Sequence, residues 1–113
     1  MSEIRITAPA VALRGMAILP GMVAHFDVSR DISIQAVEEA MLEDQKIFLV
    51  IQKDLETDIP ELDNLYRMGI IAEIKQVIKM QHGIIRVLVE GKSRAELCDI
   101  LSKEPYLQAE IRP

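Results

Sequence analysis

The feature of this sequence that most constrains the fold is an alternation of apolar and polar residues between Leu65 and Arg94. Before Gly83 the apolar side chains fall mainly on even positions, from Ile70 to Met80, interrupted at Gln76. After Gly83 they fall on odd positions, from Ile85 to Val89. A period of two residues is typical of a β-strand with one buried face. The change of parity across a glycine predicts a turn, so the whole stretch predicts one long β-hairpin.

A two-residue loop at His82-Gly83 would set the register of this hairpin. It pairs Met80 with Ile85 and Ile78 with Val87 on one face, and Lys75 with Glu90 and Glu73 with Lys92 on the other. A slip of one residue would place Ile78 opposite Arg86 and lose both charge pairs. The apolar residues of the first arm also fit helical spacing, but their β-branched character and the matching second arm favour a strand.

Length and composition indicate a single domain with an aliphatic core. The chain has 113 residues, half of them hydrophobic, with 4% aromatic residues and no Trp. Cys98 is the one cysteine, so no intramolecular disulfide is expected. The N-terminus lacks the features of a signal peptide, and no run approaches the roughly 18 apolar residues that span a bilayer. We expect a soluble cytoplasmic domain without a membrane partner.

The net charge of −5 argues against a general nucleic-acid-binding surface. Acidic residues crowd the segment from Asp54 to Asp63, whereas the predicted hairpin carries several lysines and arginines. A mildly basic hairpin face therefore stays open as an alternative to an ordinary solvated face.

Four further elements are expected around the hairpin. Two short strands precede a helix, one from Ala10 to Leu13 and one over Met22–Val28. The helix is expected over Ser33–Asp44, capped by Asp31 or Ser33, with a buried stripe of Ile34, Val37, Ala40 and Met41. The apolar run Ile47–Ile51 predicts a strand buried on both faces. Residues 94–101 fit a helix or a strand, and Leu107–Ile111 predicts a last strand.

The loop between the first two strands is unusually apolar, and Met22 follows it directly. It contains Met16, Ile18 and Leu19 between Gly15 and Gly21. One interpretation is a lid that tucks these side chains onto the core; the other is an exposed patch that binds a partner. Met16, Ile18, Leu19 and Met22 are the candidate protein-contact residues of the chain.

Other chemistry is less well supported by the sequence. Gly91-Lys92-Ser93 lacks the upstream glycine of a phosphate-binding loop, because that position is Arg86. His25, His82 and Cys98 show no metal-ligand spacing, and no nucleophile lies in a recognisable catalytic motif. The acidic residues 54–63 alternate like those of a calcium loop but lack its glycine. We predict no catalytic, cofactor-binding or metal-binding residue in this segment.

Several short motifs follow one another in an order known from a protein family. They are Leu13-Arg14, then Pro20-Gly21-Met22-Val23, then Tyr66 with Gly69, and finally the run from Val87 to Ala95, VLVEGKSRA. With the helix and the strand after it, this order resembles the N-terminal domain of Lon, the ATP-dependent protease. The sequence departs from the family pattern at Ala12 (usually proline), Gly15 (usually aspartate) and Gln81-His82 (usually Pro-Asp or Pro-Asn).

The resemblance implies an α+β, mainly β fold: a PUA-like, six-stranded pseudobarrel with one packed α-helix. It implies that residues 1–113 form a single Lon N-terminal, substrate-recognition domain, which we expect to be a piece of a longer chain. It also implies a hexameric parent enzyme, an ATP-dependent serine endopeptidase for misfolded and regulatory proteins. ATP and Mg²⁺ are implied for the parent enzyme and not for this segment.

Three functional hypotheses follow. The first is a non-catalytic domain that engages unfolded or tagged substrate proteins and supports the hexamer. The second is a stand-alone Lon-N-like module that binds a small ligand or RNA through the basic hairpin face. The third is self-association through an exposed strand edge.

Overall fold

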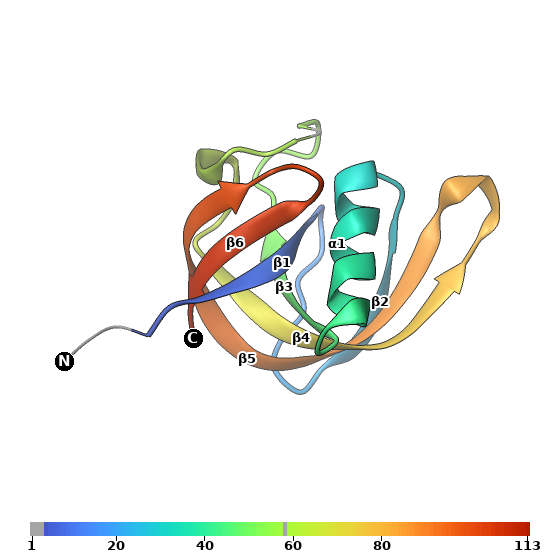
Figure 1. The fold of residues 1–113 in the computed structure, drawn as a ribbon, viewed down its shortest axis with the longest axis horizontal. Helices are drawn as coiled ribbons and strands as arrows, with labels where there is room; N and C mark the ends of the chain where they lie inside the picture. The colour runs from blue at the N-terminus through green and yellow to red at the C-terminus, as the bar shows by residue number, and fades with distance from the viewer. Residues whose placement is uncertain (1–3, 58) are drawn as a thin grey trace.

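The computed structural model describes residues 4–57 and 59–113 and shows a closed, mainly antiparallel sheet with one helix (Figure 1). The sheet order is β2-β5-β4-β3-β1-β6, and β5 pairs with β6 to close it. Five strands form the ring, while β2 pairs with the first half of β5 outside it. The strands are β1 (Ile6–Leu13), β2 (Val23–Val28), β3 (Lys46–Ile51), β4 (Met68–Lys79), β5 (Ile85–Ser102) and β6 (Leu107–Arg112). The predicted six-stranded pseudobarrel with one helix is confirmed.

Two apolar clusters lie on opposite faces of the ring strands. In β3, Ile47 and Leu49 face one cluster while Phe48 and Val50 face the other, and β1 alternates in the same way. The barrel core fills the interior of the ring, where several alanines suit the narrow space. The helix-side core lies between the outer face of β1 and β3, the helix and the curled β2–β5–β4 arm. The prediction of a strand buried on both faces at 47–51 is therefore confirmed.

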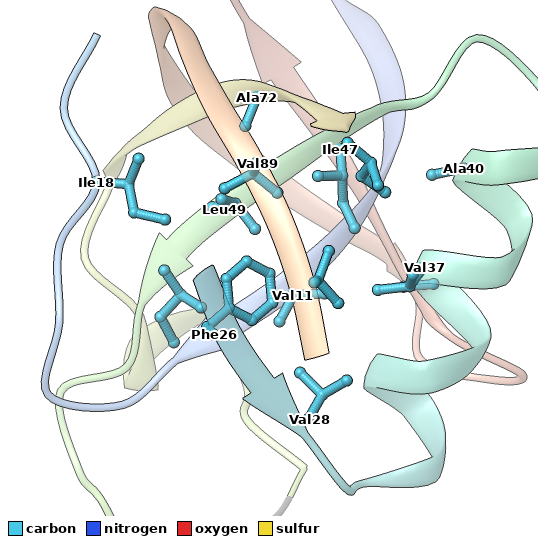
Figure 2. Close-up of a cluster of buried hydrophobic side chains, with 14 of the residues drawn as sticks. Val11, Ile18, Phe26, Val28, Val37, Ala40, Ile47, Leu49, Ala72 and Val89 are labelled. Carbon is cyan, nitrogen blue, oxygen red and sulfur yellow. The ribbon is translucent and has the colours of Figure 1, made fainter. Parts of the chain in front are cut away.

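The helix α1 (Asp31–Leu42) lies in the angle between the ring and this arm (Figure 1). Val37 and Ala40 point from it toward Ile47 and Val11 (Figure 2). It begins two residues earlier than predicted and Arg30 is its N-cap, with no side-chain cap bond, so the predicted caps Asp31 and Ser33 are wrong. The predicted stripe is also partly wrong: Ser33 and Ala36 are buried, whereas Met41 is 38% exposed.

The predicted hairpin is present as β4 and β5, but its register is wrong by one residue. The tip is a single turn of 3-10 helix, Gln81–Gly83, closed by the Met80 amide donating to the Ile84 carbonyl at 2.8 Å. Three residues instead of two in the loop place Ile78 opposite Arg86. His82 adopts φ +63°, a left-handed conformation that few side chains tolerate.

A register shift in the β4–β5 pairing brings the predicted charge partners close together, although they are not directly opposite each other. The β4–β5 pairing shifts between Ile74 and Gln76, so Glu73 lies directly opposite Glu90. Lys75 lies 3.3 Å from Glu90, and Lys92 lies 3.6 Å from Glu73. The expected partners therefore meet diagonally, with each lysine between two carboxylates.

A second register shift in the β4–β5 pairing changes which side chains of β5 face the interior of the ring. Ala72 pairs with Gly91 and Ile71 with Ser93, so Lys92 is the extra residue of a β-bulge. Before the bulge the odd residues of β5 enter the helix-side core; after it, Ala95 and Leu97 enter the barrel core. The same strand continues through residues 94–101, which resolves the ambiguity there in favour of a strand, and the predicted last strand is β6.

Candidate protein-contact surface

The apolar loop between β1 and β2 ends in a tight turn at Leu19-Pro20-Gly21-Met22. The Met22 amide donates to the Leu19 carbonyl at 3.0 Å, and Gly21 has φ +82°. Proline at the second position and a glycine with positive φ at the third match a type II turn. The sequence therefore specifies this turn locally, before any contact with the rest of the molecule is considered.

The turn is fastened to β5 at Gly91. The Gly21 amide donates to the Gly91 carbonyl at 2.8 Å, and the Gly91 amide donates to the Met22 carbonyl at 2.9 Å. A Cβ at position 91 would lie 2.3 Å from the Leu19 carbonyl oxygen. The glycine of the Gly-Lys-Ser sequence is thus explained by close packing of the turn on β5, and the tripeptide lies within a strand.

The middle of the same loop is anchored in the helix-side core. Ile18 is 6% exposed and points toward Leu49 (Figure 2). Met16 is partly buried against the same cluster. The lid interpretation therefore holds for these two residues. Ile18 is buried and offers little surface to a partner. The exposed residues around it are therefore the better candidates for a protein contact.

The other two candidate residues are exposed, and so are two apolar residues that the sequence analysis missed. Leu19 is 54% and Met22 40% exposed, and so are Val23 (60%) and Met68 (55%). Leu19 and Met68 line one shallow cavity of about 190 Å³. We call Leu19, Met22 and Met68 the loop patch; the Val23 side chain lies on the opposite face of the sheet, beside its pairing partner Glu90. Val23 could have been found from the alternation of β2, whereas Met68 belongs to β4 and is brought close only by the folded sheet.

Three of the basic residues of the hairpin, Lys75, Arg86 and Lys92, are paired with carboxylates. Arg86 donates to both carboxylate oxygens of Asp27, at 2.8 and 3.2 Å, and this bond holds the pKa of Asp27 below its usual value. The bond from Lys75 likewise lowers the pKa of Glu73, and that from Lys92 lowers the pKa of Glu90. Paired charges of this kind present a mixed surface and lend no support to RNA binding by the hairpin.

The residues considered for metal binding lie apart. His25 is in β2, His82 in the hairpin tip and Cys98 in the second half of β5. Across residues 4–57 and 59–113, no group of three or more His, Cys, Asp or Glu side chains is placed to hold a metal ion. In the acidic segment, the Asp54 carboxylate accepts bonds from the Glu56 amide and the Thr57 hydroxyl and so closes a local turn. Asp58, part of the calcium-loop alternative, lies outside the described residues.

Fold and surface together define a class: a small domain with a closed mainly β sheet, one packed helix and an exposed apolar loop. No helix among the described residues has the length and apolar character to cross a membrane. Residues 7–113 match the family model of the ATP-dependent protease La (LON) substrate-binding domain. The chain belongs to this family.

Relatives and solved structures agree with the family match. The chain is 54% identical over 111 residues to Lon protease of Lachnoclostridium phytofermentans, and 42% identical over 110 residues to Lon protease 1 of Bacillus subtilis. These alignments cover 98% and 97% of this chain but 14% of each relative. The N-terminal domain of a Mycobacterium avium complex Lon protease superposes with a TM-score of 0.74 at 23% identity, covering 94% of this chain and 53% of that one. A Lon N-terminal domain protein from Xanthomonas campestris gives a TM-score of 0.70 at 13% identity over 94% of this chain and 58% of that one.

Proposed function

We propose that this domain holds unfolded or tagged segments of substrate proteins for an ATP-dependent, Lon-type serine protease, and that the loop patch makes the contact. The observation that carries the proposal is the exposure of Leu19 and Met22 on a loop that is itself firmly anchored, with Met68 of β4 lining the same cavity as Leu19. An apolar patch fixed to a rigid scaffold binds apolar segments without first having to order itself. Two methionines suit varied sequences because their flexible side chains adapt to many shapes.

In this proposal the chain does no catalysis, and the rest of the enzyme supplies the chemistry. The parent protein contributes the ATPase module with its ATP and Mg²⁺, the protease site and the hexameric assembly, in the cytoplasm. Support comes from the relatives named Lon protease, of which this chain spans about one seventh of the length. Reading the gene downstream of residue 113 tests this part: a Walker motif supports it, and a stop codon at that point contradicts it.

The contact surface is tested with Leu19→Asp and a matched control, Leu42→Asp. Both substitutions place a carboxylate at an exposed leucine, but Leu42 lies at the end of α1 and is 82% exposed. Binding of a fluorescently labelled, reduced and alkylated unfolded protein is followed by anisotropy. Loss of about 1–2 kcal/mol of apolar contact predicts roughly five- to thirtyfold weaker binding for L19D. L42D is expected to bind like the unmodified chain.

Two outcomes would refute the assignment of the contact to the loop patch. If L42D weakens binding as much as L19D, the effect is one of net charge and not of the loop patch. NMR shift perturbations by the unfolded protein that avoid the segment 19–23 would also remove the loop patch from the proposal.

A further inference from the structure

The strand β2 has one edge that no other strand covers. Its pairing partner among the described residues is β5, on one side only. Hydrogen-bonded and non-bonded positions alternate along an antiparallel pair. Since Gly91 donates to the Met22 carbonyl, the register makes Ala24, Phe26 and Val28 the positions that bond to β5. The main-chain groups of Val23, His25 and Asp27 therefore point to the uncovered edge.

This edge lacks several of the features that commonly prevent strand addition. Natural edge strands are protected by proline, by lysine, by bulges or by a covering segment. Residues Val23–Val28 contain neither proline nor lysine, and their pairing with β5 runs without a register shift. No backbone hydrogen bond from another described segment reaches Val23, His25 or Asp27. Six residues give an edge of about 20 Å, enough for a short extended peptide.

There is room beside the edge. A cavity of about 360 Å³ is lined by four consecutive β2 residues, 25–28, and by the end of β1 and the loop after it. Successive side chains of a strand point to opposite faces, so a cavity that touches four in a row meets β2 edge-on. Arg14, Arg30, His25 and Asp27 are among the polar residues that line it.

We propose that the uncovered edge of β2 binds an extended segment of an unfolded protein by adding it as a further strand. This inference rests on the proposed function and specifies how the substrate is held. Val23 is the first residue of β2 and follows Met22 directly, so this edge begins where the loop patch ends. Main-chain hydrogen bonds are the same for every sequence, and the loop patch then selects apolar side chains. That combination fits a domain that must accept many different unfolded chains.

The first test is a pair of variants at one position, His25→Pro and His25→Ala. Both remove the imidazole, but only proline removes the main-chain N–H that faces the uncovered edge. Because this N–H makes no bond to β5, proline is tolerated there as on other edge strands. The probe is a labelled peptide, acetyl-Thr-Val-Glu-Val-Thr-Val-amide. We expect H25P to bind the peptide about tenfold more weakly than H25A, or worse, since the two variants differ in the main-chain N–H. Equal binding by the two variants overturns the proposal.

A second measurement needs no variant and so does not depend on H25P folding. Amide hydrogen exchange of the unmodified chain is recorded with and without the peptide. Strand addition slows exchange at Val23, His25 and Asp27, while Ala24 and Phe26, already bonded to β5, change little. Protection that does not alternate in this way overturns the proposal. So does a dimer in sedimentation whose alternating protection of β2 is already present without the peptide.

The two proposals fail in different ways. If the unfolded protein binds and L19D weakens that binding, but H25P binds the peptide as tightly as H25A does, the loop patch stands and strand addition is refuted. If neither the unfolded protein nor the peptide binds, both proposals fall.

Discussion

Replacing Gly91 with alanine tests the account of how the loop patch is positioned. Gly91 lies inside a strand, and no positive φ requires a glycine there. On backbone entropy alone, alanine in a strand interior would stabilise the fold by roughly 0.5–1 kcal/mol. The structure predicts the opposite sign, because the new Cβ would lie 2.3 Å from the Leu19 carbonyl oxygen and 2.8 Å from the Ile70 side chain.

The size of the effect follows from what the clash displaces. Relief to ordinary van der Waals distance moves the Leu19 carbonyl by about 1 Å, since 3.4 Å less 2.3 Å is 1.1 Å. That shift breaks the two hydrogen bonds that join the turn to Gly91, each with a net value of about 0.5–1.5 kcal/mol. Partial withdrawal of Ile18 from the core adds about 1 kcal/mol. We expect a total loss of about 2–4 kcal/mol, or roughly 10 °C or more in Tm.

The assay is thermal and urea unfolding of Gly91→Ala beside Gly15→Ala. Gly15 lies in the same loop and has φ +72°, and a Cβ added there would meet no atom within 4 Å. Alanine at position 15 should therefore cost only about 1 kcal/mol of backbone strain. NMR shifts of G91A should change around Leu19 and Met22. A G91A variant as stable as the unmodified chain, or more stable, would refute the close-packing argument.

Three further predictions concern other parts of the fold. Gln52 is 2% exposed and its side-chain amide donates to the Asp54 and Thr57 carbonyls, so Gln52→Leu should cost about 2 kcal/mol and speed proteolysis of the loop after β3. His82→Gly should raise stability by up to about 1 kcal/mol in urea unfolding, because glycine adopts φ +63° without strain. Glu73 and Glu90 have lowered pKa values, so their contribution is present at neutral pH and lost as pH falls through their folded-state pKa values. Replacing Lys75 with Gln should flatten the decline of Tm between about pH 6 and pH 3.

The sequence predicted most of the fold because its periodicities are strong and local. The alternation in the hairpin corresponds to β4 and β5, the apolar run at Ile47–Ile51 to β3, and the alternation before Arg112 to β6. What could not be predicted depends on single extra residues. One more residue in the turn at His82 and one extra residue at Lys92 each shift the pairing, and nothing in a period of two reveals where such a residue will lie.

The sequence predicted which loop forms the candidate surface, but not which of its side chains are exposed. Composition shows that Met16, Ile18 and Leu19 are apolar; it does not show which of them turns inward. The type II turn decides this, because it fixes Leu19 and Met22 at the surface while Ile18 reaches the core. Met68 was missed because it is far from the loop in sequence and joins it only once β4 is in place.

Because of the bulge at Lys92, the fold of this domain depends on the exact number of residues at one point of β5. Because the bulge reverses the faces of β5, Ala95 and Leu97 reach the interior of the ring only if Lys92 is present as an extra residue. Deleting Lys92 would turn every later side chain of the strand to the opposite face, although the composition would hardly change. Insertions in the acidic segment between β3 and β4 should be far better tolerated, since that segment runs along the surface. A library of single-residue deletions would thus mark position 92 as sharply as any substitution does.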